Sequence, residues 1–290
     1  MAAEGWGDTP VAASTIVMGS GGRGENYLFP DQDNGFIIAD YPQQEHARID
    51  AFFIELAERM CRDLNEFGIP YCNGYCMAVN PLWRKTLPQW IAQIGQWTRR
   101  GSTVAIRLTD IFFDFQPVWG ETELARELRR VVGDLVSNNR SFLREMYHDK
   151  LEHNVALSLF GGFVVERDNR DYRGQVNLKY SGTLPLVSGI RLLALREGVE
   201  ETSTLHRIRA LTEKGVFNRT DQEELSEAFR VISDVLLRQQ IADFRAGRRV
   251  TYYVNPEALT KRERAHLLAA LRSIHALRKR AHLEFTAHVF

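Results

Sequence analysis

The sequence predicts an α+β first half followed by an all-helical second half. Short runs rich in β-branched and aromatic residues alternate with helical patterns up to about residue 135. From residue 184 to the end, apolar residues recur at helical spacing almost without interruption. The length of 290 residues fits two domains of roughly 150 residues each. We place these domains at residues 1–143 and 144–290.

The composition is typical of a globular protein, with 44% hydrophobic and 26% charged residues. The 37 basic and 37 acidic side chains cancel, so net charge gives no argument for a nucleic-acid or membrane partner. No apolar run approaches the roughly 18 residues of a membrane span, and the N-terminus lacks the layout of a signal peptide. We therefore expect a cytoplasmic protein.

The first predicted strand, Ile16–Met18, leads into a glycine-rich turn. Gly19-Ser20 is followed by three more glycines within four residues. A turn of this kind exposes backbone N–H groups and, where it leads into a helix, can bind phosphate. The pattern therefore indicates a phosphate site, although glycine-rich turns are more often only turns.

Asp31 and Asp33 precede the apolar run Phe36–Ile38. In a strand, side chains two residues apart point to the same face, so we expect both carboxylates on one surface. Two acids this close repel each other unless a cation lies between them, and Mg²⁺ prefers oxygen ligands. An acidic segment alone is typical of a solvated loop. Its position after the glycine turn favours a catalytic site, or a former catalytic site that has lost its activity.

The next segments supply a core and one further candidate. A core-facing helix is predicted over residues 43–67, which ends before Gly68-Ile69-Pro70. Trp83, Trp90 and Trp97 recur every seven residues, which on a helix forms one stripe, and core packing is favoured over base stacking. Asn80-Pro81 is the predicted entry to that helix. Arg84 could reach a phosphate, although an arginine without such a role, exposed to solvent, is more common.

Residues 104–118 form a predicted strand that carries two more acids, Asp110 and Asp114. Asp114 lies among three phenylalanines. Burying an acid in so apolar a run is costly unless something pairs with it, and a metal ion would do so. We therefore select Asp114 as a third candidate ligand, with Asp110 as the alternative.

The three cysteines, Cys61, Cys72 and Cys76, are expected to be thiols, because an odd number does not suit a disulfide framework. No second Cys/His pair at zinc-finger spacing accompanies Cys72 and Cys76, so the sequence disfavours zinc.

Helical patterns dominate the remaining sequence. They begin after residue 121 and return at residues 184–196, 203–214, 222–244 and 260–285. Thr260 and Glu263 have the spacing of a capping box. The second half is therefore predicted to be a helix bundle.

Gly-Ser followed after ten residues by Asp-x-Asp resembles the signature of the nucleotidyltransferase superfamily that includes DNA polymerase beta. GSGGRGENYLFPDQDN resembles more closely the GSEGRGEQ…TDQDN pattern of a bacterial nucleotidyltransferase family related to PII uridylyltransferase. Members often carry cyclic-nucleotide-binding and CBS domains ahead of this one. FDFQPVWG and VNLKYSGTLPLVSGIRLLAL extend the resemblance over about the whole chain. The sequence departs from the family's pattern at Gly21, Pro30, Gln116 and Asn177, and none of these departures removes a candidate metal ligand.

The resemblance implies a polymerase-beta-like mixed sheet with helices, followed by a helical substrate-binding domain. It also implies two Mg²⁺ ions, with Mn²⁺ as an alternative, held by Asp31, Asp33 and Asp114, the last of which could accept the proton of the attacking hydroxyl. Triphosphate ligands would be Gly19, Ser20, Arg23, Arg84 and Lys179. Glu25 is expected to orient Arg23.

The implied reaction transfers a nucleoside monophosphate from a nucleoside triphosphate to an acceptor hydroxyl and releases pyrophosphate. By family analogy the first choice of acceptor is a regulatory protein in signal transduction, modified by uridylyl or adenylyl transfer. Transfer to a small molecule is an alternative, and long nucleic acid is the least favoured acceptor. A catalytically silent nucleotide sensor and a purely structural pair of domains are the rivals from other classes, and a homodimer is left open.

Overall fold

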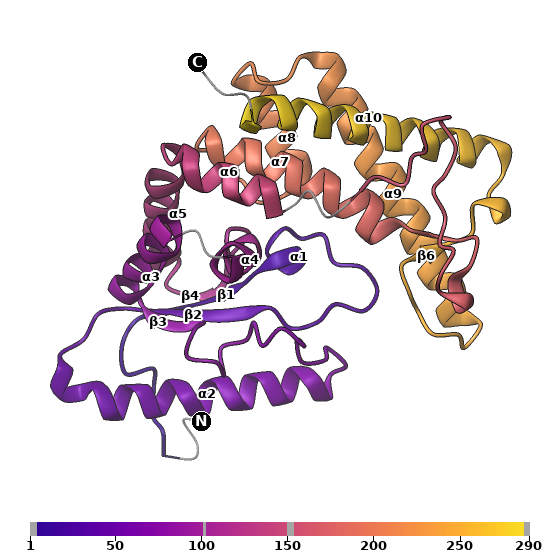
Figure 1. Cartoon of the computed structure of the whole chain (residues 1–290). Coiled ribbons are helices and arrows are strands. Elements are labelled where there is room, and N and C mark those ends of the chain that lie inside the picture. Colours follow the sequence, from indigo (N-terminus) through magenta and orange to yellow (C-terminus); the bar gives the residue numbers. More distant parts are fainter. Residues whose placement is uncertain (1–4, 101–102, 150–153, 287–290) are drawn as a thin grey trace. The chain divides into compact units, whose positions relative to one another are not determined.

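The computed structural model describes residues 5–100, 103–149 and 154–286 (Figure 1). The chain divides into two compact units, Met1–Asn138 and Asn139–Phe290. The sequence placed the boundary at 143/144. The first unit contains a four-stranded sheet with helices, and the second is mainly helical, so the α+β and helical-bundle predictions are confirmed.

The sheet of the first unit is mixed and has the order β3-β2-β1-β4. Its strands are β1 (Ala13–Val17), β2 (Asn34–Ile38), β3 (Arg84–Thr86) and β4 (Gln116–Gly120). The central strand β1 is antiparallel to both β2 and β4, whereas β2 and β3 are parallel. The position of β1 matters for the site, because its two neighbours both begin where it ends.

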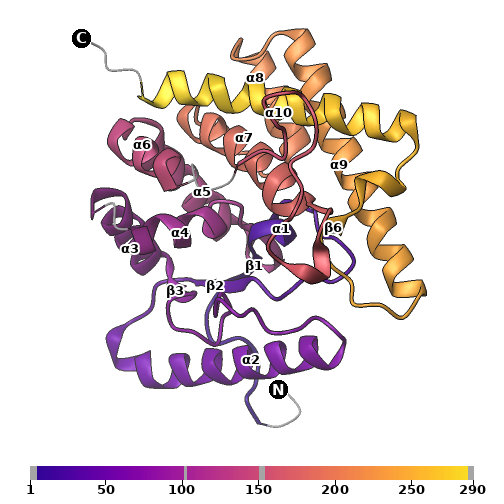
Figure 2. The ribbon, with the colours of Figure 1, turned by 45° about the vertical axis from the view of Figure 1, so that its right-hand side comes forward.

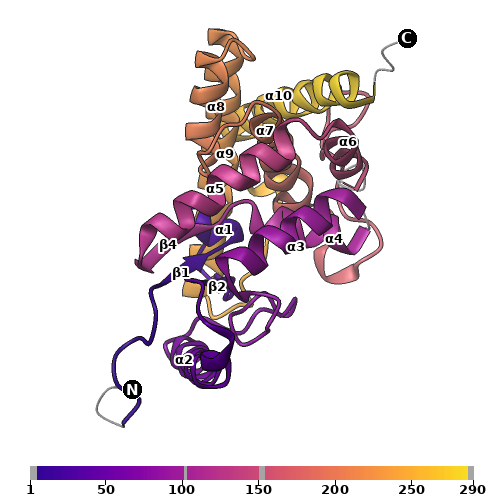
Figure 3. The same ribbon diagram turned by 90° about the vertical axis from the view of Figure 1, so that its left-hand side faces the viewer.

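Helix α2 (His46–Glu66) covers one face of this sheet, and α3 (Leu87–Arg100), α4 (Thr103–Phe112) and α5 (Thr122–Ser137) lie on the other (Figure 3). The predicted apolar face of α2 is confirmed: its buried residues pack against apolar side chains of β1 and β2, in a core that includes Ala13, Phe36, Ile38, Ile49, Phe52, Phe53 and Ala57. A short 3₁₀ turn, Gln43–Glu45, precedes the helix.

The predicted tryptophan stripe forms the core on the opposite face. Trp83, Trp90 and Trp97 are buried and surround Phe112, whose ring centroid lies 4.6 Å from that of Trp90. The indole N–H of Trp90 donates to the carbonyl of Phe36 at 2.9 Å, which ties α3 to the sheet. Core packing is therefore confirmed. The predicted helix entry at Asn80-Pro81 is wrong, because Trp83 precedes β3 and the helix begins at Leu87.

The predicted strand over residues 104–118 is also wrong. Its first part is α4, and only the part from Gln116 onward forms β4. The buried residues of α4, Ala105, Ile106, Thr109 and Phe112, follow helical spacing. Its β-branched composition favours a strand, but such propensities are weak and packing against the core decides.

The second unit is a helix bundle made of α6 (Arg140–Asp149), α7 (Leu184–Arg196), α8 (Thr204–Glu213), α9 (Arg219–Arg245) and α10 (Lys261–Thr286) (Figure 2). Helix α7 is buried around most of its circumference, as expected of a central helix. A two-stranded ribbon of β5 (Val176–Asn177) and β6 (Tyr253–Val254) was not predicted. No helix in the described ranges is both long enough and apolar enough to cross a membrane.

Both long helices of the bundle begin with capping boxes. On α10 the predicted pair is confirmed, since Thr260 N donates to Glu263 at 2.8 Å and Glu263 N donates to Thr260 Oγ1 at 3.2 Å. On α9, Asp221 N donates to Asn218 Oδ1 at 2.9 Å, and Asn218 N donates to Asp221 Oδ2 at 3.1 Å. Each box satisfies N–H groups that have no partner within the helix.

Replacing Asn218 by alanine is expected to lower the free energy of unfolding of the bundle by about 1 kcal/mol, because the first turn of α9 loses an acceptor. Urea unfolding followed by far-UV circular dichroism measures the change. Asn218→Ser is the control, since serine caps helices about as well. Equal losses in the two variants would contradict the capping role.

Candidate functional site

The register of the sheet gathers three segments at one end of β1. Val17, the last residue of β1, pairs with Asn34 on β2 and with Gln116 on β4. Asp33 comes directly before β2, and Asp114 lies two residues before β4. Because β1 is antiparallel to both neighbours, its carboxyl end meets their amino ends. The glycine turn that follows β1 therefore lies beside both segments that carry acids.

The glycine turn is a single helical turn, α1 (Gly19–Gly22). Gly19 has a positive φ of 54°, and a Cβ built on it would lie 2.8 Å from Asp33 Oδ2. The N–H of Met18 donates to the carbonyl of Asp33 at 2.9 Å. Only glycine suits this backbone and leaves room for the carboxylate. The turn and Asp33 consequently form one site.

Gly22 makes a second close approach. A Cβ on this residue would lie 1.9 Å from the carbonyl oxygen of Asp114 and 2.8 Å from that of Val17. Helix α1 therefore packs directly on the backbone that leads into β4. This contact fixes the distance between the turn and the third candidate acid.

Asp114 is fully buried and forms an ion pair with Arg23, whose Nη1 lies 2.6 Å from its Oδ2. The Nε of Arg23 lies 2.7 Å from Oε2 of Glu25. The sequence predicts that a buried Asp114 needs a partner, and the guanidinium of Arg23 is that partner. Arg23 thus bridges two carboxylates, and the Glu25 contact fixes its direction. Asp110, the alternative third acid, lies on α4 and is half-buried.

The remaining candidate phosphate ligands have other contacts. Ser20 Oγ donates to Asn26 Oδ1 at 2.7 Å, which closes the turn. Arg84 is buried, donates to the carbonyl of Ala78 at 2.7 Å and lies 3.6 Å from Asp50, so it holds the loop that precedes β3. Lys179 belongs to the second unit, where its Nζ lies 3.1 Å from the hydroxyl of Tyr252.

The strand predicted for Asp31 and Asp33 is wrong, since both precede β2 in an extended loop. Between and after them, Gln32 and Asn34 are buried. Gln32 Nε2 donates to two backbone carbonyls at 2.8 Å, and Asn34 Oδ1 accepts from Ala78 N at 2.9 Å. The amides anchor the segment, while Asp31 is exposed and Asp33 lies against Gly19. These anchoring amides are not among the residues predicted from the sequence, although the acid-amide alternation in DQDN is a signal for them.

Asn34→Ala is expected to destabilise the first unit by about 1–3 kcal/mol, because the buried N–H of Ala78 loses its acceptor. Urea unfolding monitored by tryptophan fluorescence measures this loss. Asn73→Ala, in the loop that carries Ala78 but with an exposed side chain, is the matched control and is expected to be near neutral. A similar effect of the two substitutions would refute the anchoring role.

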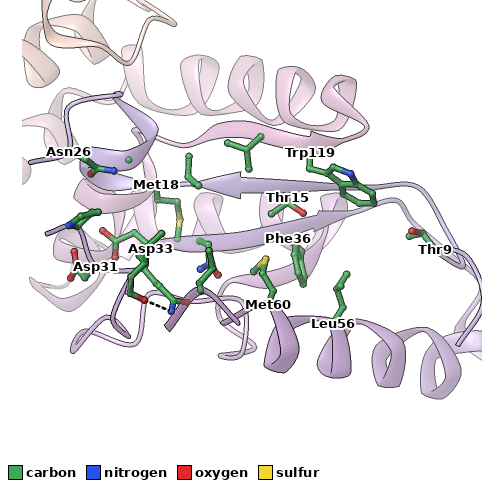
Figure 4. Close-up of a pocket in the computed structure, with 18 of the residues that line it drawn as sticks. Thr9, Thr15, Met18, Asn26, Asp31, Asp33, Phe36, Leu56, Met60 and Trp119 are labelled. Carbon is green, nitrogen blue, oxygen red and sulfur yellow. Dashed lines mark hydrogen bonds between the residues drawn. The ribbon is translucent and has the colours of Figure 1, made fainter. Parts of the chain in front are cut away.

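A cavity of ≈ 720 Å³ opens along the first unit between the sheet and α2 (Figure 4). Asn26, Asp31 and Asp33 lie at one end, and Thr9 and Trp119 at the other. Between them the lining is mostly apolar, with Phe36, Leu56 and Met60. Pockets of this size and character hold small molecules. The shape suits a ligand with a charged end and an apolar ring.

Two cysteines approach Asp33 from the loop before β3. Cys72, Cys76 and Asp33 have potential ligand atoms that all lie within 4.8 Å of one another. A hydrogen bond from Cys76 lowers the pKa of the Cys72 thiol to about 6, and the same contact raises the pKa of Cys76 well above its ordinary value. Both cysteines are buried thiols, as predicted. Within residues 5–100, 103–149 and 154–286, no other group of three or more His, Cys, Asp or Glu is so arranged, so the acids at 31, 33 and 114 are not gathered in this way.

Comparison with protein families agrees with the motif. Residues 1–103 match the model described as "Putative nucleotidyltransferase DUF294", and residues 140–285 match "Putative nucleotidyltransferase substrate binding domain". The chain belongs to this nucleotidyltransferase family. The glycine turn and the acids at 31 and 33 fall within the first match, and Lys179 within the second. A search of the curated proteins found no match.

Proposed function

We propose that the protein transfers a nucleoside monophosphate from a nucleoside triphosphate to an acceptor hydroxyl, with release of pyrophosphate and dependence on Mg²⁺. The observation that carries the proposal is the contact between the glycine turn and Asp33 at the acidic end of the ≈ 720 Å³ cavity. Backbone donors for phosphate and oxygen ligands for a cation thus lie together at one end of a space for a nucleoside.

The triphosphate would lie on the first turn of α1. The N–H groups of a first helical turn have no acceptor within the helix and are suited to phosphate oxygens. Gly19 and Ser20 provide this turn, and Arg23 follows directly after α1. Since guanidinium pairs bidentately with phosphate, Arg23 would exchange Asp114 for a phosphate oxygen when nucleotide binds.

The donor set fits magnesium. Asp31 and Asp33 offer carboxylate oxygens beside the phosphate turn, and Mg²⁺ commonly takes one or two carboxylates together with substrate phosphates and water. Asp114, once released by Arg23, would complete a set for two ions and accept the proton of the attacking hydroxyl. The ions would neutralise the triphosphate and favour in-line displacement at its α-phosphate, and Mn²⁺ could replace them.

The nucleoside would occupy the apolar body of the cavity. Phe36 and Met60 line this part, and the indole of Trp119, 59% exposed, lies at its far end. A flat base can pack on such surfaces, and the charged phosphates then point toward Asp31 and Asp33.

The acceptor that we favour is a hydroxyl on a regulatory protein, modified by uridylyl or adenylyl transfer. The second unit matches a model described as substrate binding, which supports an acceptor large enough to need a domain of its own. The zero net charge gives no argument for a long nucleic acid as the acceptor.

A catalytically silent nucleotide sensor is the second candidate. The Arg23–Asp114 ion pair favours it, because in this pair the third candidate acid already has a cationic partner other than a metal ion. Turnover separates the two candidates, since a sensor binds nucleotide without releasing pyrophosphate.

The test uses the full chain, Mg²⁺ and each of the α-labelled ribonucleoside triphosphates with lysate of the source cell, followed by a denaturing gel. A labelled protein band that disappears in the Asp31→Asn, Asp33→Asn double variant is expected. Asp63→Asn, an exposed acid on α2, is the matched control and should keep the band. No label and no pyrophosphate with any triphosphate would overturn the proposal in favour of the sensor.

A further inference from the structure

The proposed reaction makes no use of the two buried cysteines beside Asp33. We propose that Asp33, Cys72 and Cys76 form a site for a thiophilic divalent cation such as Zn²⁺. Their ligand atoms already lie within 4.8 Å of one another. Two thiolates and a carboxylate are ligands that zinc accepts, whereas magnesium is bound almost only through oxygen. The site would therefore select a different metal from the one that the reaction needs.

The loop between the cysteines brings the two sulfur atoms together. Tyr75 N donates to the carbonyl of Cys72 at 3.0 Å, which closes a tight turn. Tyr75 has φ 53° and is the one non-glycine residue with positive φ in the described ranges. Such a backbone costs of order 1 kcal/mol and persists where the surroundings enforce it. A Cβ on Gly74 would lie 3.5 Å from Cys72 Sγ and 3.6 Å from Cys76 Sγ, so both sulfurs lie over this glycine.

The third ligand comes from a distant part of the sequence. The N–H of Asn34 donates to the carbonyl of Cys76 at 2.9 Å, which aligns the cysteine loop with the start of β2. The carboxylate of Asp33 then faces the two sulfurs, and the ligand atoms of all three residues lie within 4.8 Å of one another. The sequence lacked a second Cys/His pair at the usual spacing, and the fold supplies a carboxylate in its place.

The separations suit a tetrahedral ion after a small contraction. With Zn–S bonds of about 2.3 Å, two sulfurs of a tetrahedron lie about 3.8 Å apart. The 4.8 Å limit on the present separation of the two sulfurs therefore requires them to close by at most about 1 Å. Asn73 and Tyr75 are exposed, so the loop can adjust without disturbing the core. Three protein ligands leave the fourth position to water.

Occupation of this site would inhibit nucleotidyl transfer, because the thiophilic ion would compete with the triphosphate's magnesium for the carboxylate of Asp33. This consequence rests on the proposed function, whereas binding of the ion does not. The arrangement would make the protein sensitive to zinc at the carboxylate that its reaction uses.

The test is titration of the reduced full-length protein with Co²⁺, a spectroscopic substitute for Zn²⁺. We expect one equivalent to produce thiolate-to-cobalt charge-transfer absorption that Zn²⁺ abolishes and excess Mg²⁺ does not. Cys76→Ser should weaken Co²⁺ binding by more than about 100-fold, since a direct ligand is lost. Cys61→Ser, which removes the third buried thiol, is the matched control and should retain the absorption.

Two results would overturn the inference: no charge-transfer absorption with the folded wild-type protein, or absorption that survives in Cys76→Ser at unchanged affinity. Circular dichroism establishes that each variant is folded. In the labelling assay, Zn²⁺ should inhibit the wild type at least about tenfold more strongly than Cys76→Ser. If no transfer occurs at all, the proposed function fails while the cobalt result still decides this site.

Discussion

Gly22→Ala is expected to destabilise the first unit by about 3 kcal/mol or more, which would be the largest stability effect of a single methyl group in this site. The added Cβ would lie 1.9 Å from the carbonyl oxygen of Asp114 and 2.8 Å from that of Val17. Both are backbone atoms, which cannot rotate out of the way as a side chain can. Either α1 or the segment before β4 must shift. The shift also moves Asp114 relative to the glycine turn, so activity should fall with stability.

Gly21→Ala is the matched control in the same helical turn. Its Cβ would meet Asn26 Nδ2 at 3.6 Å and Val17 Cβ at 3.7 Å, which are ordinary contacts. We expect the free energy of unfolding of Gly21→Ala to remain within about 1 kcal/mol of that of the wild type, because alanine is favoured over glycine in a helix. Urea unfolding monitored by tryptophan fluorescence compares the two variants. A neutral Gly22→Ala would show that α1 does not pack on the Asp114 backbone.

Asp114→Asn is expected to lower the rate of nucleotidyl transfer by roughly three orders of magnitude while triphosphate affinity changes little. Asparagine keeps the shape of the side chain but can neither neutralise a second cation nor take a proton from the acceptor hydroxyl. Arg23 still has Glu25 as an anionic partner, 2.7 Å away, so it remains positioned for the phosphates. Single-turnover kinetics and calorimetric titration with nucleotide separate rate from affinity.

Glu25→Gln serves as the control for the Arg23 network. It removes the other carboxylate of Arg23 but leaves Asp114 intact, and we expect a smaller loss of rate together with weaker triphosphate binding. If Asp114→Asn instead retained transfer within about tenfold of the wild type, Asp114 would be a buried ion partner of Arg23 and not a catalytic acid.

The parts of the fold that the sequence predicts well are those in which local pattern and packing agree. Helix α7 spans Leu184–Arg196 as predicted, because its apolar run is long enough for a helix and is buried around most of its circumference. The start of α10 follows from the Thr260–Glu263 capping box, which is a purely local signal. The glycine turn is also a local signal, because Gly19 is needed for its positive φ and Gly22 for the close approach of the Asp114 backbone.

The errors arise where tertiary contacts decide. Residues 103–112 have the composition of a strand, yet α4 is a helix because its spacing buries Phe112 among the tryptophans. Asp31 and Asp33 were assigned to a strand, although the buried amides of Gln32 and Asn34 hold them in a loop. The approach of Cys72 and Cys76 to Asp33 depends on pairing between distant segments, which no local pattern contains.

Asp31 and Asp33 are expected to hold a metal-bound triphosphate at the acidic end of the cavity. Calorimetric titration with a non-hydrolysable triphosphate analogue tests it most directly, because it needs no acceptor. We predict binding that weakens at least about tenfold when EDTA removes the metal or when both acids become asparagine, whereas Asp63→Asn binds as the wild type does. Affinity that is independent of metal and unchanged in the double variant would contradict the account.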